Sequence, residues 1–188
     1  MDIRSTALPE VKVIIPARHG DARGFFGESW NKALLAKHGI TTDFVQDNHS
    51  LSMQAGTVRG VHFQTPPHAQ YKLVRCGRGS LLDVAVDLRK GAPTFGQWVA
   101  EILSFENGHQ LLVPAGFAHG FVTLETGTEI IYKCSDYYAP DCDRALQFDD
   151  PAIGIDWGIS RAQATLSPKD AAAPALADLN NPFLWEEN

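Results

Sequence analysis

The sequence predicts an all-β fold, a jelly-roll β-barrel or sandwich with few short helices. Three observations lead to this prediction. Short segments in which apolar and polar residues alternate recur along the chain, glycine, proline or asparagine separates them, and only one segment has a clear helical pattern. Because a barrel of this kind can enclose a small ligand, we expect a binding site in its interior.

Composition and charge narrow the possible partners. With 188 residues, 44% of them hydrophobic, the chain can bury a core, and we expect one domain over residues 1–188. The formal net charge of -6 leaves no general cationic field for nucleic acid or a membrane surface. No stretch approaches the ~20 apolar residues of a membrane helix, and the first residues lack a secretory signal, which favours a cytoplasmic location. The three cysteines show no C-x-x-C spacing, so we expect free thiols.

The elements are expected in the following order. Residues 31–39, NKALLAKHG, have a helical pattern that the final glycine can close in the left-handed conformation. Residues 57–64, 70–76 and 80–89 alternate as strands do, and the glycines before residue 80 predict a turn between the last two. Asn107-Gly108 separates two apolar runs, 99–106 and 109–116, and predicts a β-hairpin between them. Residues 127–138 form another β-rich run.

Polar residues inside the predicted strands indicate a site. Alternation gives shared faces that mix polar and apolar residues: Val58, Gly60, His62 and Gln64; Gln70, Lys72, Val74 and Cys76; Leu81, Asp83, Ala85 and Asp87. A lysine on the inner face of a barrel is costly unless it is paired or solvated, so it tends to mark a ligand cavity. The same pattern also fits faces that point to solvent, and alternation does not distinguish the two. His119, beside phenylalanines, is by itself more typical of a core residue than of a ligand.

Eight motifs in order resemble those of one family. They are DARGFFGESW, QDNHSLS, GTVRGVHFQ, QYKLVRCGRGS, DLRKGAPTFGQW, VPAGFAHGF, EIIYKCSDYYAP and SPKD, and they span roughly residues 20–170. The series resembles the dTDP-4-dehydrorhamnose 3,5-epimerases of the cupin superfamily. The resemblance implies a cupin-type jelly roll, an isomerase activity and a dTDP-4-keto-6-deoxyhexose substrate.

Cupins commonly bind a metal through a His-x-His pair, a glutamate and a later histidine. Here the pair reads His62-Phe63-Gln64, and the later histidine is His119. Two histidines without a carboxylate at the expected spacing make a poor site for a divalent ion. We therefore expect no catalytic metal and no other cofactor.

The implied chemistry needs two groups that handle protons, because C3 and C5 both lie next to the 4-keto group. The resemblance implies His62 as the base, Asp170 as the carboxylate that orients it and Tyr132 as the proton donor on the other face of the sugar. It places Lys72 and His119 near the C4 oxygen, where they would stabilise enolate charge. From the local sequence alone, the SPKD motif favours a helix cap, and the tyrosine fits a core aromatic equally well.

A second group of residues is implied to bind the nucleotide. Arg23 and Arg59 match residues that contact the diphosphate, and Tyr138 matches the residue that stacks on the thymine ring. Arg59 and His62 are an odd number of residues apart, so a regular strand would place them on opposite faces. The remaining matched positions are Glu28, Gln46, Asp47, Asn48, Lys169 and Asp143, the last standing where the family often has glutamate.

The resemblance also implies a homodimer in which N-terminal strands cross to the neighbouring barrel, so that Arg23 and Glu28 serve the partner's site. The expected reaction converts dTDP-4-dehydro-6-deoxy-D-glucose to dTDP-4-dehydro-L-rhamnose, in dTDP-L-rhamnose biosynthesis. The alternative is a relative that inverts only C3 or only C5 of another dTDP-4-keto-deoxysugar. A metal-dependent oxygenase is disfavoured by Gln64, and a non-catalytic sugar-binding cupin is disfavoured because both proton handlers are present.

Overall fold

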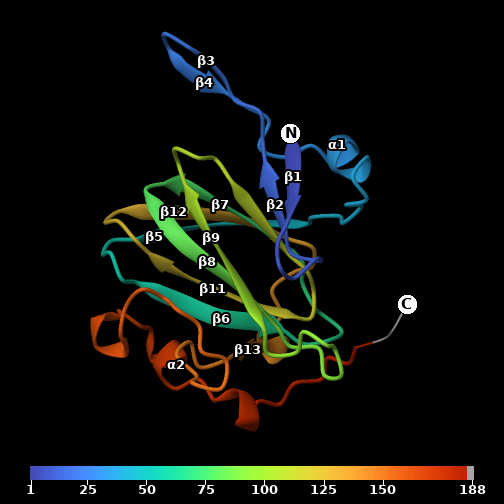
Figure 1. Cartoon of the computed structure of the whole chain (residues 1–188), viewed down its shortest axis with the longest axis vertical. Coiled ribbons are helices and arrows are strands. Elements are labelled where there is room, and N and C mark those ends of the chain that lie inside the picture. Colours follow the sequence, from blue (N-terminus) through green and yellow to red (C-terminus); the bar gives the residue numbers. More distant parts are fainter. Residues whose placement is uncertain (186–188) are drawn as a thin grey trace.

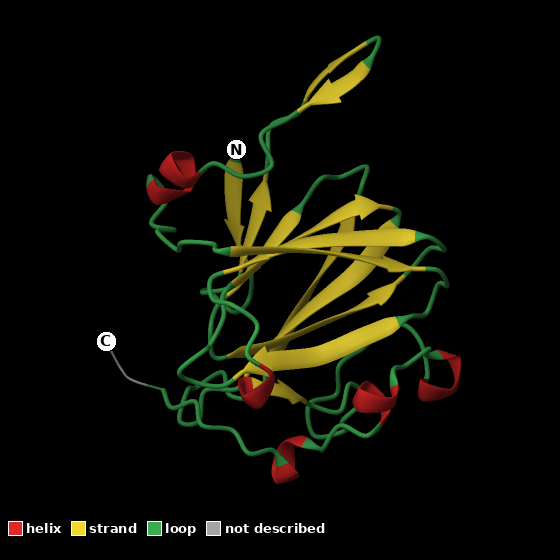
Figure 2. Ribbon diagram, turned by 180° about the vertical axis from the view of Figure 1, so that it is seen from behind, coloured by secondary structure: helices red, strands yellow, loops and turns green. Residues whose placement is uncertain are grey.

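Two antiparallel β-sheets packed face to face form the body of the molecule (Figure 2). The computed structural model describes residues 1–185. The six-stranded sheet has the order β1 (Asp2–Ser5), β2 (Lys12–Ile15), β10 (Gln110–Val113), β7 (Lys72–Arg78), β12 (Thr128–Cys134) and β5 (Gln46–Ser52). The five-stranded sheet has the order β13 (Asp143–Ala145), β6 (Val58–Gln64), β11 (Phe117–Thr123), β8 (Ser80–Asp87) and β9 (Trp98–Ser104). The predicted all-β sandwich is confirmed.

Helices are few and short, as predicted. α1 (Lys32–Ala36) follows Asn31, whose side-chain oxygen accepts a hydrogen bond from the Leu34 N–H at 3.0 Å, and Gly39 comes after it with a φ of +79°. The other helical elements are α2 (Pro168–Ala171), η1 (Pro140–Cys142), η2 (Arg161–Gln163) and η3 (Leu176–Asp178). Within residues 1–185, no helix is long and apolar enough to cross a membrane.

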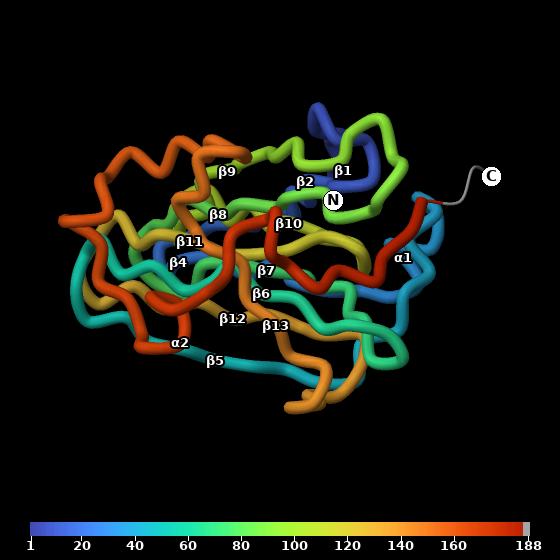
Figure 3. Tube along the Cα trace, turned by 90° about the horizontal axis from the view of Figure 1, so that it is seen from below, coloured from blue at the N-terminus to red at the C-terminus, as the bar shows by residue number. Residues whose placement is uncertain are grey.

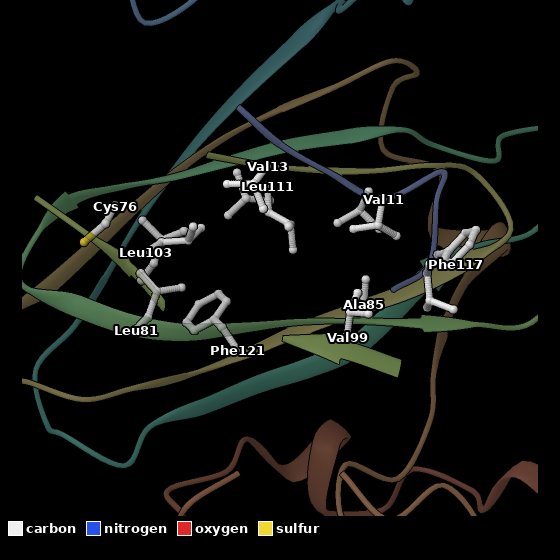
Figure 4. Close-up of a cluster of buried hydrophobic side chains, with 14 residues drawn as sticks. Val11, Val13, Cys76, Leu81, Ala85, Val99, Leu103, Leu111, Phe117 and Phe121 are labelled. Atoms are coloured by element: carbon white, nitrogen blue, oxygen red, sulfur yellow. The ribbon is translucent and has the colours of Figure 1, made fainter. Parts of the chain in front are cut away.

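The main apolar core lies between the two sheets (Figure 4). Leu81, Ala85 and Phe121 of the five-stranded sheet meet Val13 and Leu111 of the six-stranded sheet. All five residues are buried. Burial of apolar surface contributes about 25 cal/mol per Å², so this contact supplies much of the free energy that holds the sheets together.

A second core lies beneath the five-stranded sheet. Val84 of β8 packs there with Phe148 and Trp157 of the C-terminal segment. Figure 3 shows this segment, in orange and red, crossing that sheet. Both faces of β8 are therefore covered, and the face that carries Asp83 and Asp87 lies inside the molecule.

The predicted hairpin at Asn107-Gly108 is wrong. β9 pairs with β8, whereas β10 pairs with β2 and β7 in the other sheet. The turn itself is present: Gly108 has a φ of +64°, and the Asn107 side chain accepts hydrogen bonds from the N–H groups of Ser104 and His109. Because an Asn-Gly pair determines the local turn and not the partner of each strand, this turn carries the chain from one sheet to the other.

β6 contains a β-bulge that changes the predicted alternation. Between the cross-strand pairs His119–His62 and Phe121–Arg59, β11 advances by two residues and β6 by three. The extra residue brings Arg59 to the same cavity as His62, although a regular strand would place them on opposite faces.

Gly60 makes the bulge possible. Its φ is +116°, and a Cβ atom there would lie only 2.7 Å from the Gly120 Cα atom of β11. The prediction that Val58 shares a face with His62 is wrong. Because of the bulge, Val58 packs in the core beneath the sheet.

A two-stranded hairpin projects from the body of the molecule (Figure 1). β3 (His19–Asp21) and β4 (Gly24–Phe26) pair only with each other among the described strands. Phe25 and Phe26 are 48% and 71% exposed. The hairpin therefore buries little apolar surface of its own.

Candidate active site

A cleft between the two sheets contains most of the polar residues singled out in the sequence. Its first lobe has a volume of about 380 Å³ and its second lobe about 400 Å³, and both are lined by His62, Lys72 and Tyr132. His62 lies on the five-stranded sheet, whereas Lys72 and Tyr132 lie on the six-stranded sheet. The two sheets therefore present these side chains from opposite walls of one cleft.

The first lobe contains a histidine-carboxylate pair. The His62 Nε2 atom lies 2.5 Å from Asp170 Oδ1, and Asp170 is 3% exposed. Burial by itself raises the pKa of Asp170, but the hydrogen bond and charge of His62, with further hydrogen bonds from Ser167 and the Gly60 N–H, hold the pKa below its ordinary value. The ionised carboxylate accepts a hydrogen bond from the Nε2–H group of His62, which leaves the other ring nitrogen of His62 as a proton acceptor.

The local fold fixes the position of Asp170. It is the third residue of α2, and its N–H donates to the Ser167 Oγ atom at 3.1 Å. The Ser167 hydroxyl in turn donates to Asp170 Oδ2 at 2.9 Å. The segment before α2 is tied to the start of β6, because Thr165 exchanges backbone hydrogen bonds with Gly56 and Val58. The helix cap expected from the sequence and the contact with His62 are both present.

A second histidine-carboxylate pair was missed in the sequence analysis. His119 Nε2 lies 2.7 Å from Asp83 Oδ1, and the two residues are 6% and 0% exposed. Burial raises the pKa of Asp83, although His119 and Lys72 act in the opposite direction. The second carboxylate oxygen, Oδ2, has no hydrogen-bond partner within residues 1–185. The sequence signal for this pair is an aspartate in the middle of an apolar strand.

Lys72 and Tyr132 supply an amine and a phenol from the facing sheet. Burial lowers the pKa of Lys72 in spite of nearby acidic groups that raise it, and its Nζ atom lies 3.5 Å from the His62 carbonyl oxygen. Burial raises the pKa of Tyr132, so its hydroxyl keeps its proton at neutral pH. The cleft thus combines a proton acceptor, an amine and a proton donor around one space.

The second lobe brings together five predicted nucleotide-binding residues, Gln46, Asn48, Tyr138, Asp143 and Lys169. Lys169 Nζ lies 2.5 Å from Asp143 Oδ2, and the Tyr138 hydroxyl donates to the same oxygen at 3.2 Å. The Gln46 side-chain oxygen accepts from the Tyr138 N–H at 2.9 Å. The shorter carboxylate of Asp143 therefore still reaches both neighbours.

Three predicted binding residues do not line this cleft. Alternation in β5 turns Asp47 to the outer face, where Lys133 Nζ contacts it at 2.9 Å. The Arg23 side chain, at the tip of the projecting hairpin, is 89% exposed, and Glu28 lies just beyond the hairpin. Arg59, by contrast, lines the first lobe because of the bulge in β6.

The cleft lacks the donor set of a cupin metal centre. In the part of the chain that the structure describes, no three His, Cys, Asp or Glu side chains are grouped to hold a metal ion. His62 and His119 each contact a carboxylate, and Gln64 uses its amide for hydrogen bonds to nearby backbone. These residues do not fit a divalent ion.

Comparisons with known proteins agree with this geometry. The family model for dTDP-4-dehydrorhamnose 3,5-epimerase matches residues 5–178. The dTDP-4-dehydrorhamnose 3,5-epimerase of Sinorhizobium fredii is 52% identical over 185 residues, covering 98% of this chain and 94% of that protein. The crystal structure of dTDP-6-deoxy-D-glucose-3,5-epimerase from Legionella pneumophila with dTDP-4-keto-L-rhamnose gives a TM-score of 0.93 at 46% identity, covering 98% of this chain and 99% of that chain.

A more distant structure has a related but narrower activity. ChmJ, a 3'-monoepimerase from Streptomyces bikiniensis solved with dTDP-quinovose, gives a TM-score of 0.83 at 32% identity, covering 92% of this chain and 87% of that chain. The predicted cupin-type fold and the isomerase class are therefore confirmed. Because the family model and these relatives match nearly the whole length, the chain belongs to the dTDP-4-dehydrorhamnose 3,5-epimerase family.

Proposed function

We propose that the chain converts dTDP-4-dehydro-6-deoxy-D-glucose to dTDP-4-dehydro-L-rhamnose by inverting C3 and C5, a step of dTDP-L-rhamnose biosynthesis. The observation that carries the proposal is the presence of proton-handling groups on opposite walls of one cleft, His62 with Asp170 on one wall and Tyr132 on the other. The proposal includes a single catalytic domain over residues 1–188 and the cytoplasmic location predicted from the sequence.

In this mechanism His62 removes the proton from C3 or C5. Both C–H bonds lie next to the 4-keto group, so the electron pair left on carbon is delocalised onto the C4 oxygen as an enolate. Asp170 accepts a hydrogen bond from the Nε2–H group of His62 and stays ionised, which fixes the tautomer and stabilises the imidazolium that forms. The imidazolium then loses the proton to solvent before the next carbon reacts.

Tyr132 gives a proton to the opposite face of the same carbon, which inverts its configuration. Its raised pKa keeps the phenol protonated until the enolate is present, and the resulting phenolate recovers a proton from solvent. Lys72 and His119 line the same lobe and stabilise the negative charge that develops on the C4 oxygen. The chemistry needs no electron transfer and no Lewis acid.

The second lobe is proposed to hold the nucleotide. Tyr138 is 58% exposed and offers a flat ring on which thymine can stack. Arg59, at the first lobe, offers its guanidinium to the diphosphate. Gln46, Asn48, Asp143 and Lys169 line the same lobe as Tyr138 and would supply polar contacts to the nucleotide.

Solvent exchange tests the reaction. Purified protein is incubated with dTDP-4-dehydro-6-deoxy-D-glucose in D2O, and NMR follows deuterium at C3 and C5. Deuterium at both carbons with L-rhamno product is expected, and none in His62→Asn. Tyr132→Phe is expected to retain exchange by His62 but to lose inversion, because the proton returns from the original face. Absence of exchange at either carbon in the wild-type protein overturns the proposal.

The second candidate is a single-site epimerase. A 3'-monoepimerase, ChmJ, is 32% identical to this chain, whereas the more similar relatives are 3,5-epimerases. The same base and acid can serve one carbon, so the cleft alone fits both reactions. Deuterium confined to C3 or to C5 in the experiment above would identify this activity in place of the double inversion.

We further propose a homodimer in which the β3–β4 hairpin enters the partner's cleft and supplies Arg23 and Glu28. Phe25 and Phe26 are exposed in the single chain, and an isolated two-stranded ribbon is marginally stable. Both facts support a dimer in which the partner covers the hairpin. Light scattering should give twice the chain mass. Mixing and refolding inactive Arg23→Ala and His62→Ala chains should restore activity if the arginine acts across the interface, and no recovery contradicts the exchange.

A further inference from the structure

Gln64 occupies the position where other cupins have the second histidine of their metal-binding pair. It lies at the end of β6, two residues beyond His62, and is 4% exposed. A buried primary amide needs partners for two N–H groups and one oxygen, and leaving them unpaired is costly. The partners that Gln64 has indicate what it does in place of metal binding.

All of the hydrogen bonds of the Gln64 amide go to backbone atoms. Its Nε2 atom donates to the His68 carbonyl at 2.7 Å and to the Tyr137 carbonyl at 3.1 Å, and its Oε1 atom accepts from the Ala139 N–H at 2.8 Å. Both N–H groups are therefore used. The two contacts at 137 and 139 lie on either side of Tyr138.

Tyr138 itself makes two further hydrogen bonds, and its ring is largely exposed. Its backbone N–H donates to Gln46 at 2.9 Å, its hydroxyl donates to Asp143 at 3.2 Å, and the residue is 58% exposed. An exposed aromatic ring binds a planar ligand well only if its backbone is already fixed, because ordering a mobile segment costs free energy on binding.

We infer that Gln64 is a positioning residue for the nucleotide half of the cleft, and that its amide fixes residues 137–139 so that Tyr138 is ready to stack on the base. This inference rests on the proposed function, in which Tyr138 contacts thymine. Gln64 does not touch the reacting carbons in this scheme, so it acts on the binding of the nucleotide and not on proton transfer. At the position where other cupins have a metal ligand, Gln64 thus stabilises a loop.

Gln64→Met tests this inference, because methionine has a similar length and no amide. Stacking on an aromatic side chain contributes about 1–3 kcal/mol, so KM for the dTDP-sugar and Kd for dTDP are expected to rise roughly 5- to 150-fold. The kcat is expected to stay within about threefold, because His62, Asp170 and Tyr132 are untouched. Gln147→Met is the matched control, since among the described residues its amide hydrogen-bonds only to Asp149 and the residue does not line the cleft.

A double-mutant cycle separates positioning from general destabilisation. If Gln64 acts through Tyr138, Gln64→Met is expected to weaken dTDP binding little further when Tyr138→Ala is already present. Thermal unfolding identifies variants that fail to fold. Gln64→Glu is a second test variant, because it keeps the acceptor for the Ala139 N–H group and loses both donors; the same rise in Kd is expected for it.

The outcomes separate this inference from the proposed function. Wild-type binding of dTDP that is unchanged by Tyr138→Ala contradicts the stacking role itself. Weak binding by Tyr138→Ala together with wild-type Kd in folded Gln64→Met and Gln64→Glu contradicts only the positioning role. A third outcome also overturns the inference. If Gln64→Met lowers kcat as much as it raises KM, and if its effect on dTDP binding adds fully to that of Tyr138→Ala, then Gln64 has a purely structural role.

Discussion

Asp170→Asn tests the histidine-carboxylate pair most directly. The substitution removes the negative charge that lies 2.5 Å from His62 Nε2 and keeps the size of the side chain. It also keeps the backbone N–H of residue 170, which donates to the Ser167 side chain that caps α2. An amide at this position cannot stabilise an imidazolium, and its NH2 group can turn toward the ring and favour the wrong tautomer.

The size of the loss follows from the burial of this contact. Asp170 is 3% exposed, so solvent does not replace the missing charge. A hydrogen bond to a charged group contributes about 1.5–3 kcal/mol, and each 1.4 kcal/mol lost from the transition state lowers the rate about tenfold. The charge alone therefore accounts for roughly a 10- to 150-fold loss. With the tautomer change included, we expect kcat to fall about 10²- to 10⁴-fold with little change in KM.

Initial rates of deuterium exchange at C3 and C5, measured by NMR at saturating substrate, give the effect on the chemical steps. Ser167→Ala is the control, because it removes the cap and the contact with Asp170 Oδ2 but keeps the carboxylate charge. We expect it to lower the free energy of unfolding by about 1 kcal/mol and to reduce exchange less than Asp170→Asn does.

One result would refute this reasoning about Asp170. If folded Asp170→Asn exchanges both protons at close to the wild-type rate while His62→Asn exchanges neither, the base works without the carboxylate charge. The short contact between the two side chains would then be structural.

Three further predictions concern other charged groups. Lys72→Met is expected to lower kcat about 10²- to 10³-fold, because it removes the amine that is proposed to stabilise the enolate, and steady-state kinetics with unchanged kcat would contradict this. Asp83→Asn is expected to lower kcat, because the carboxylate beside His119 is lost. It is expected to keep or raise Tm, because burial raises the pKa of Asp83 and one of its oxygens has no partner within residues 1–185; calorimetry showing a large drop in Tm would contradict this. Asp87 is buried, which raises its pKa, but Arg89 and Thr94 hold the pKa below the ordinary 3.8, so its stabilising effect is present above that value and lost as the pH falls below it. Urea unfolding between pH 5 and pH 2 should therefore show a shallower loss of stability for Asp87→Asn than for the wild-type protein below about pH 3.8, and parallel curves there would contradict the stabilising role of the Asp87 charge.

Period-two alternation and turn residues predicted the strands from β6 to β10 and β12, but they did not predict β5 or β11, nor which face of each strand lies inside. In β8 the face with Asp83 and Asp87 lies between the two sheets, and the C-terminal segment covers the apolar face, so both faces are buried. That segment lies far along the chain, and alternation within ten residues carries no information about it. Asp83 was missed as the partner of His119 for this reason.

Turn residues predicted the local backbone conformation but not which strands pair with each other. Asn107-Gly108 makes the predicted turn, but the strands on either side pair in different sheets. The bulge at Gly60 could not be read from alternation, since the glycine that permits it looks like any other turn or strand glycine. Without that bulge Arg59 would face away from His62 and would not share its cavity.

The SPKD motif shows why local and functional interpretations need not compete. The sequence offered a helix cap and a carboxylate beside His62 as alternatives for Ser167 and Asp170, and the structure contains both the cap and the contact with His62. The cap hydrogen bond fixes the backbone of Asp170, while the same Ser167 hydroxyl donates to its carboxylate and leaves Oδ1 for His62. A carboxylate on a flexible loop would have to be ordered in every catalytic cycle, whereas one at the third position of a capped helix is already oriented. The features that made the cap the better local interpretation are therefore the ones that suit this aspartate to hold His62.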